Sequence, residues 1–346
     1  MYVLVMGKRQ GILKALKSLG VDYSIWPETG DQAITHIIAG TEKSVIPASQ
    51  LRRELNARIN PLTEVEKCAD KLIMKRFLAQ HSIAMTDFLP GHCDLKGKTI
   101  LERLGTPVIA KPRKSSGGRG LTRVTNEADL KIYQNEDFIF EKQIKGTEGS
   151  VESFIKDQKV TFENITRYVH PGEANILPGD YSEDIKNQIL NLNRKVISAM
   201  GIRWGMTHLE FYITQDKVLF GEIAIRPPGG YIMELIKKVY DFDPWQAFVN
   251  LELDIPSDFK MKPNGFAASL VIPRREGIVQ SVSGLEAAEA LPTLARLKIR
   301  VKPGDTLQKR EGVSDSCGHA LFYGENKAHV LADLEAARQI IQIKIK

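Results

Sequence analysis

The chain has 346 residues, of which 42% are hydrophobic and 26% charged, and its formal net charge is +6. This composition is typical of a globular protein with two or three domains, and it excludes a low-complexity or fibrous chain. Basic residues are spread along the whole chain. This favours a solvated basic surface or anionic small molecules over a nucleic-acid partner.

No apolar stretch approaches the roughly 18 residues that a membrane span requires, and the first residues indicate a strand rather than a signal peptide. The three cysteines have no metal or redox spacing, which is typical of free thiols in a reducing compartment. We therefore expect a cytoplasmic protein with neither nucleic-acid nor membrane partners. A homodimer is one option for its assembly.

The first 65 residues alternate short apolar strands with helical segments. The expected strands and helix are Tyr2–Met6, Gln10–Leu19 (the helix), Tyr23–Trp26 and Ile34–Ala39. Alternating β and α elements favour a parallel sheet, so this unit is predicted to be a small α/β domain.

A single helix is expected over Glu64–Gln80, where apolar residues recur at helical spacing. Lys71 and Lys75 lie four residues apart on it, so both could face one phosphate. For Lys75 we favour the alternative, a solvent-exposed lysine.

A lysine and a small-residue segment follow each other near the middle of the first half. Pro107–Pro112 is a short apolar strand that carries Lys111 near its end, and Ser115–Gly120 follows it. Small residues allow backbone amides to approach a phosphate closely, although such a segment is also typical of a hairpin turn. Walker A and G-x-G-x-x-G patterns are both missing, so neither a P-loop nor a dinucleotide fold is predicted.

The next strand, Phe138–Ile144, ends in charged residues and leads to Glu148. Such charges can protect an edge strand. The same segment can also present backbone groups to an adenine and a carboxylate to a ribose.

Two segments with alternating polarity, Thr207–Ile213 and Lys217–Ile225, predict antiparallel strands joined by a tight turn at Gln215 and Asp216. Helices are expected nearby at Ile185–Met200 and Asp243–Leu253.

One face of this predicted hairpin is charged. Glu222, Ala224 and Arg226 share a face because side chains repeat every two residues, and Glu210 of the partner strand can join them. Carboxylates suit Mg²⁺, which usually accompanies nucleotide phosphates. The alternative is a hairpin with a solvated polar face.

Pro227–Tyr231 follows the charged strand and is predicted to be a stiff turn. The amides of Gly229 and Gly230 are candidates for binding a substrate carboxylate.

After Pro263–Gly265 the chain is expected to form an α+β unit. Its predicted strands and helices are Phe266–Pro273, Gly277–Val279, Leu285–Leu291 (helix), Leu297–Lys302, His319–Tyr323 and Ala328–Ile343 (helix).

Together, the segments from about Asp70 to Tyr231 resemble the ATP-grasp superfamily in their order and spacing. The C-terminal unit is similar in pattern to that of ATP-grasp L-amino acid ligases and, more distantly, of biotin carboxylases. The resemblance implies an ATP-grasp fold with α/β and α+β parts. We expect a small N-terminal α/β domain (1–65), a central grasp (66–262) with a mobile lid at about 98–150, and an α+β C-terminal domain (263–346).

The resemblance also implies an ATP site. Lys71 and Lys111 would contact the phosphates, and the loop would close over them through Ser115, Ser116, Gly117 and Gly118. The adenine hinge would consist of Glu141, Lys142 and Ile144, with Glu148 on the ribose.

By the same resemblance Glu210 and Glu222 would bind Mg²⁺, with Mn²⁺ as a substitute, and Arg226 would stabilise the reacting phosphate. Arg226 and Lys111 are thus the expected catalytic residues, and Arg226, Gly229 and Gly230 the expected substrate contacts. One residue departs from the family pattern Glu-x-Asn-x-Arg, because Ala224 stands where the Asn ligand is expected.

The resemblance implies an ATP-dependent carboxylate–amine ligase that forms an acylphosphate and then an amide, releasing ADP and phosphate. Its substrates would be a small carboxylate and an amine. Two alternatives stay open: a bicarbonate-using enzyme of biotin carboxylase or carbamoyl-phosphate synthetase type, and a non-catalytic ATP-binding regulatory module, which Ala224 motivates.

Overall fold

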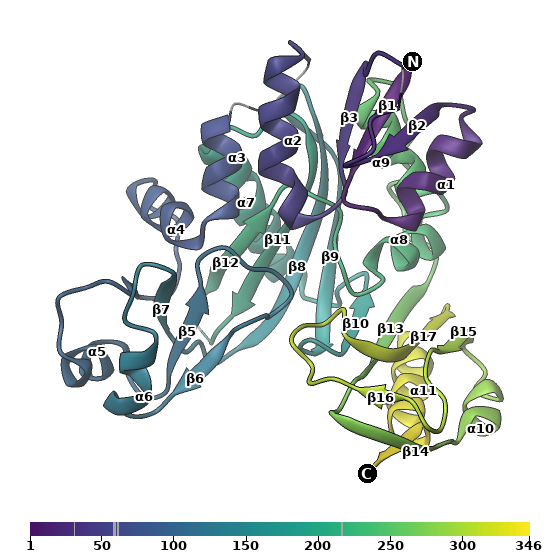
Figure 1. Ribbon diagram of the computed structural model, residues 1–346. Helices are drawn as coiled ribbons and strands as arrows, with labels where there is room; N and C mark the ends of the chain where they lie inside the picture. Colours follow the sequence, from purple (N-terminus) through teal and green to yellow (C-terminus); the bar gives the residue numbers. More distant parts are fainter. Residues whose placement is uncertain (31, 58–59, 61, 216) are drawn as a thin grey trace.

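The computed structural model describes residues 1–30, 32–57, 60, 62–215 and 217–346, and within them four β-sheets organise the chain (Figure 1). The first is a three-stranded parallel sheet, as predicted, and its strand order is β2-β1-β3. Its elements are β1 (Tyr2–Met6), α1 (Gln10–Ser18), β2 (Asp22–Ile25), β3 (His36–Ala39) and α2 (Glu42–Glu54).

Helix α2 was not predicted, because its sequence is polar and contains Pro47. Thr41 and Ser44 form a capping box at its start, which satisfies backbone donors of the first turn. Only Val45 and Ala48 of its apolar side chains are buried, so the helical period is hard to see in the sequence.

The single helix expected over Glu64–Gln80 is wrong. The structure has two helices, α3 (Leu62–Ala69) and α4 (Lys71–Gln80), which are separated at Asp70. Asp70 has an extended backbone, and its carboxylate accepts hydrogen bonds from the amides of Leu72 and Ile73. It therefore acts as the N-cap of a new helix.

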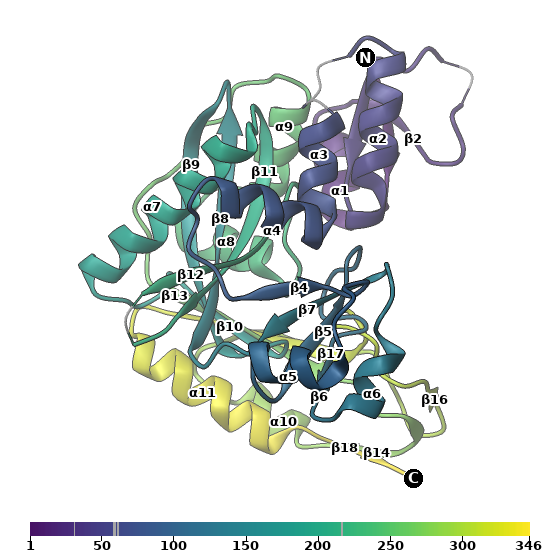
Figure 2. The same cartoon turned by 90° about the vertical axis from the view of Figure 1, so that its left-hand side faces the viewer.

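A smaller four-stranded sheet in the order β4-β7-β5-β6 lies below α4 in both views (Figures 1 and 2). It has its own apolar core, which includes Ile100, Val108 and Phe140. Its elements are β4 (Phe88–Pro90), α5 (Gly97–Leu104), β5 (Val108–Pro112), β6 (Thr122–Val124), α6 (Glu127–Ile132) and β7 (Phe138–Lys142).

The largest sheet has eight strands in the order β12-β11-β8-β9-β10-β13-β17-β15. The strands are β8 (Thr147–Lys156), β9 (Lys159–His170), β10 (Ala174–Leu177), β11 (Gly205–Ile213), β12 (Val218–Ala224), β13 (Phe266–Pro273), β15 (Leu294–Ile299) and β17 (Ser316–Gly324). Because β10 pairs with β13, the sheet continues from the central part of the chain into its C-terminal part.

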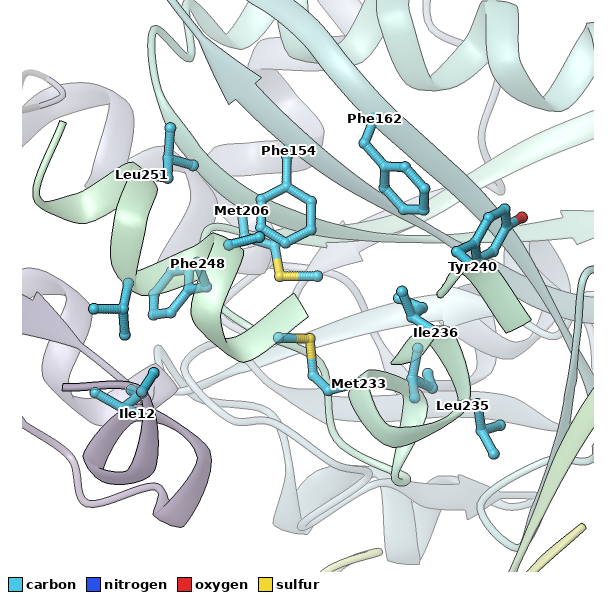
Figure 3. Close-up of a cluster of buried hydrophobic side chains, with 14 of the residues drawn as sticks. Ile12, Phe154, Phe162, Met206, Met233, Leu235, Ile236, Tyr240, Phe248 and Leu251 are labelled. Carbon is cyan, nitrogen blue, oxygen red and sulfur yellow. The ribbon is translucent and has the colours of Figure 1, made fainter. Parts of the chain in front are cut away.

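Helices cover this sheet on both faces. One face packs on α7 (Glu183–Met200), and the other packs on α8 (Ile232–Tyr240) and α9 (Pro244–Glu252). Figure 3 shows the core between the sheet and helices α8 and α9, where Ile12 of α1 lies near Phe248 and Leu251 of α9. The N-terminal unit is thus anchored to the large sheet through α9.

The C-terminal helix is shorter than predicted. Helix α11 (Lys327–Ile340) ends three residues before Ile343, and β18 (Gln342–Ile345) follows. The alternating residues of β18 pair with β14 (Gly277–Ser283), which extends beyond the predicted Gly277–Val279. The remaining elements are α10 (Leu285–Glu289) and β16 (Thr306–Leu307).

We propose domain boundaries at residues 65/66 and 262/263. The one at residues 65 and 66 lies inside α3, whereas the one at 262 and 263 lies in the loop between α9 and β13. Among the described residues no helix is long and apolar enough to cross a membrane. The three cysteines are free thiols.

Candidate functional site

The charged hairpin forms as predicted. Strands β11 and β12 are antiparallel, and Glu210 lies directly opposite Glu222. The amide of Thr214 donates to the carbonyl of Lys217 at the turn (3.0 Å), while Asp216 lies outside the described residues. Like charges directly opposite each other repel, so this pair needs a positive partner.

Lys71 supplies one positive charge on this face. Its Nζ atom lies 3.5 Å from the Oε2 atom of Glu222 and donates to the carbonyl oxygen of Ser115 at 2.7 Å. Lys71 is the first residue of α4, so the Asp70 cap, which sets the start of the helix, also sets the position of the Lys71 backbone. Asp70 also binds Arg113 at 2.7 Å, which ties the helix to the end of β5.

Lys75 is not the solvent-exposed lysine we expected. It is 1% exposed, and its Nζ atom lies 3.2 Å from Glu141, which also pairs with Lys111 at 2.8 Å. Burial alone would raise the pKa of Glu141, but the two lysines outweigh it and lower that pKa to about 2. The pKa of Lys111 is raised by Glu141 despite burial, whereas burial lowers the pKa of Lys75.

Sequence reasoning missed this triad because β7 and α4 are distant in the chain. The side chain of Glu141 lies between the two lysines, and Lys142 is exposed. The amide of Lys142 donates to the carbonyl of Asp87, and its own carbonyl accepts from Thr86 Oγ1. Ile144 lies in the loop that follows β7.

Glu148 lies at the start of β8 and faces the acidic pair. Tyr212 donates a hydrogen bond to it at 3.4 Å. Burial, followed by the nearby charge of Glu210, raises the pKa of Glu148 to about 8. Carboxyl groups are therefore crowded here, which is a suitable environment for a cation or for the hydroxyls of a sugar.

The small-residue loop, Ser115–Gly120, contacts the C-terminal unit. Gly117 and Gly118 have φ values of +64° and +73°, a region that side-chain-bearing residues rarely adopt. The carbonyl of Gly117 accepts a hydrogen bond from the amide of Val313 at 3.1 Å. Val313 belongs to the loop between β16 and β17, which therefore reaches the predicted phosphate loop (Figure 1).

Arg226 contacts the N-terminal unit, which sequence reasoning also missed. Its Nε atom donates to Glu42 of α2 at 2.7 Å. Arg9, at the start of α1, donates to the carbonyl oxygen of Pro228 at 2.8 Å. Both contacts bring the N-terminal unit against the segment that carries the expected substrate contacts.

Gly229 and Gly230 begin the turn into α8. A side chain at Gly229 would meet open space, whereas Gly230 (φ +59°) lies against Asn175. The carbonyl of Gly230 accepts from Ser269 Oγ at 2.8 Å. Their amides stay candidates for a substrate carboxylate.

His208 lies two residues before Glu210 and bridges two carboxylates. Its Nδ1 atom donates to Glu152 at 3.0 Å, and its Nε2 atom lies 3.6 Å from Glu210. Burial would lower the pKa of His208, but these carboxylates raise it to about 9. Its imidazole is therefore a second positive partner for the acidic pair.

Ala224 borders a small pocket between the sheets. The other walls include Glu42, Lys71, Ser115 and Glu222. The position where the resemblance expects an Asn thus borders both charged groups and apolar side chains such as Met74.

The residues present fit Mg²⁺. Glu210 and Glu222 offer hard oxygen ligands from neighbouring strands, and Mg²⁺ usually takes one or two carboxylates plus phosphates and waters. Within the described ranges no cluster of three or more His, Cys, Asp or Glu side chains is poised to hold a metal by itself.

Two family models match the chain. Residues 76–231 match the ATP-grasp domain, and residues 269–346 match the L-amino acid ligase C-terminal domain 2. An L-arginine-specific L-amino acid ligase from Bacillus subtilis is 26% identical over 328 residues, which cover 88% of this chain and 78% of that protein. A formate-dependent phosphoribosylglycinamide formyltransferase from Sulfurisphaera tokodaii is 22% identical, covering 94% and 86%.

Solved structures share the fold. An L-amino acid ligase from Bacillus licheniformis superposes with a TM-score of 0.82 at 16% identity, covering 100% of this chain and 98% of that one. A carboxyaminoimidazole ribonucleotide synthase from Aspergillus clavatus, solved with ATP, gives 0.78 at 16% identity, covering 98% and 97%. The expected mixed α/β architecture is thereby confirmed.

Proposed function

The chain belongs to the ATP-grasp superfamily, and from this premise we propose that it is an ATP-dependent ligase that joins a carboxylate to an amine. The observation that carries the proposal is the convergence of positive groups on the opposed Glu210 and Glu222: Lys71 lies 3.5 Å from Glu222, and the charges of Lys111 and Arg226 act on Glu210. This set matches what phosphoryl transfer requires, namely charge neutralisation and positioning.

The proposed reaction has two steps, phosphoryl transfer to the acid and attack by the amine. A carboxylate oxygen of the acid attacks the γ-phosphorus of ATP, and the bond to the bridging oxygen breaks, so that ADP leaves and an acylphosphate forms. The amine then attacks the acyl carbon. Phosphate leaves, and the proton lost by the amine goes to the phosphate or to water.

The residues of the chain have separate tasks in this scheme. Lys71 and Lys111 bind the phosphates, and Arg226 stabilises the transferred group. Glu210 and Glu222 hold Mg²⁺, which neutralises phosphate charge when bound. Ser115, Ser116, Gly117 and Gly118 close over the phosphates and exclude water, which would otherwise hydrolyse the acylphosphate.

The adenine end is assigned to β7 and the following residues. We propose that Glu141, Lys142 and Ile144 line the adenine, while Glu148 binds the ribose. Because the Glu141 carboxylate is engaged by two lysines, its contribution there would come from its backbone.

We infer that the substrates are amino acids or closely related small acids and amines. The match of residues 269–346 to an L-amino acid ligase domain supports this, as does the Bacillus subtilis relative. Gly229, Gly230 and Arg226 would then contact the acid.

The test is the release of ADP and phosphate from Mg²⁺-ATP with amino acids supplied singly and in pairs, with mass spectrometry of the products. Release that requires a particular pair, and an amide of the matching mass, is the expected result. Hydroxylamine should trap the acylphosphate as a hydroxamate when the acid is supplied alone. Tight ATP binding without any release would contradict the proposal.

A further inference from the structure

A sealed polar network lies beside the acidic pair on the same face of the large sheet. Its centre is Glu152 of β8, whose side chain is 0% exposed. The carboxylate accepts four hydrogen bonds, from Ser150 Oγ (2.7 Å), Asn164 Nδ2 (2.9 Å), Thr166 Oγ1 (2.7 Å) and His208 Nδ1 (3.0 Å). Burial of a carboxylate is costly unless it is fully hydrogen-bonded in this way.

The network fixes the orientation of His208. Glu152 lies directly opposite His208 on the neighbouring strand and directly opposite Asn164 on its other side. A carboxylate that already accepts three other donors can only accept from Nδ1, so this nitrogen carries a proton. The ring is thereby held with Nε2 directed away from Glu152.

The opposite edge of the ring faces the metal carboxylate. His208 Nε2 lies 3.6 Å from Oε1 of Glu210, and the hydroxyl of Tyr168 lies 3.4 Å from Nε2 and 3.5 Å from the same oxygen. Glu210 is thus approached by two groups whose positions depend on the sealed network.

We infer that Glu152 is a positioning residue for the proposed Mg²⁺ ligand Glu210, acting through the His208 ring. The inference rests on the proposed function, because it takes Glu210 to be the ligand. Groups that orient metal ligands in this manner typically change metal affinity by about 10- to 100-fold when they are removed.

A purely structural role is the competing explanation, because the network also links strands to α8. Tyr240 donates to Oδ1 of Asn164 at 3.0 Å. The next residue of β8 provides the matched control. Ser153 is equally buried and accepts from Asn193 at 2.9 Å, but it faces the α7 side of the sheet.

The experiment measures Mn²⁺ binding to the full chain by electron paramagnetic resonance, with ADP present, for the wild type, Glu152→Gln and Ser153→Ala. Melting temperatures and metal-free ADP affinity are recorded for each. We expect Glu152→Gln to weaken Mn²⁺ binding at least tenfold with metal-free ADP affinity unchanged. We expect Ser153→Ala to lower the melting temperature alone.

His208→Gln covers the case in which Glu152→Gln does not fold, because glutamine can still donate to Glu152. The same weakening of Mn²⁺ binding is expected, and Glu210→Gln is the positive control. If Mn²⁺ binding by both network variants stays within twofold of the wild type while Glu210→Gln loses it, the inference is overturned. A wild type that binds Mn²⁺ and ADP but forms no amide would contradict the ligase proposal and leave the positioning role intact.

Discussion

The two sides of the site hold their charges in different ways. On the large sheet, Glu152 is sealed by donors from its own strand and from two neighbouring strands, and Glu210 lies beside this network next to His208. On the smaller sheet, Glu141 of β7 pairs with Lys111 of the neighbouring strand β5 and also with Lys75 of α4, whose helix packs in a separate apolar core.

From this difference we infer that the large sheet holds the site in a fixed arrangement, whereas the smaller sheet moves to open and close it. A fully satisfied buried network holds one arrangement, which suits residues that must hold a metal in place. Contacts between separate cores can break and reform, which suits a covering element that admits nucleotide and then closes. The following experiments test this division, from the largest expected effect to the smallest.

Removal of a proposed metal ligand should have the largest effect. Glu222→Gln should reduce turnover by more than about 100-fold, because a ligand matters more than the groups that orient it. Circular dichroism should be unchanged, and Glu289→Gln on the exposed side of α10 is the control. A rate within threefold of the wild type would remove Glu222 from the metal site.

Loss of the buried Lys75 should weaken the contact between α4 and the smaller sheet. Lys75→Met should lower the free energy of unfolding by roughly 1–3 kcal/mol, less than the loss of a sole buried partner, because Glu141 keeps Lys111. Urea denaturation measures this, with Arg76→Met on the same helix as the exposed control. A double-mutant cycle with Glu141→Gln measures the coupling: the double variant should lose less stability than the sum of the two single variants, and strictly additive losses would argue against the pair.

Binding of metal and nucleotide should release a proton through Glu148. Its pKa is raised to about 8 by burial and by Glu210, so the carboxyl is mostly protonated at pH 7. A divalent cation nearby favours the ionised form, so up to about one proton should leave at pH 7 and fewer at pH 9.

Titration calorimetry in buffers of different ionisation enthalpy counts this proton. The Glu148→Gln variant should bind metal and nucleotide without the buffer-dependent heat. Equal proton release in wild type and variant would assign the proton to another group.

The loop between β16 and β17 should help to keep the proposed phosphate loop, Ser115–Gly120, closed. Val313→Pro removes the amide that donates to Gly117, a hydrogen bond worth about 1 kcal/mol, or roughly fivefold. We expect ADP formed per amide to rise by up to that factor because water enters more often. Val313→Ala keeps the amide, so its ratio of ADP to amide should equal that of the wild type. An equal ratio in both variants would exclude this role.

The smallest effect is expected at Ala224, where the pocket borders Glu42 and Lys71. Ala224→Asn adds an oxygen at the position of the family ligand and should leave turnover unchanged or raise it about twofold to threefold. Ala224→Leu has a similar volume without the oxygen, so it separates ligation from packing. If Asn lowers turnover as much as Leu, the pocket is needed for substrate.

Local rules were sufficient for the charged hairpin. A period of two places Glu210, Glu222 and Arg226 on one side of adjacent strands, and the structure has Glu210 and Glu222 directly opposite each other. The parallel N-terminal sheet also follows from alternating elements. Such features depend on neighbours in the chain, so the sequence alone determined them.

Tertiary structure decided the partners of these groups. Lys75 appears surface-like in the sequence because a lysine is rarely buried, and only the packing of α4 against β7 gives it Glu141 as a partner. Glu42 meets Arg226 across 184 positions, and Glu152 meets His208 across 56. No periodicity encodes such distances, because a buried charge is stabilised by whichever donors the folded sheet brings to it.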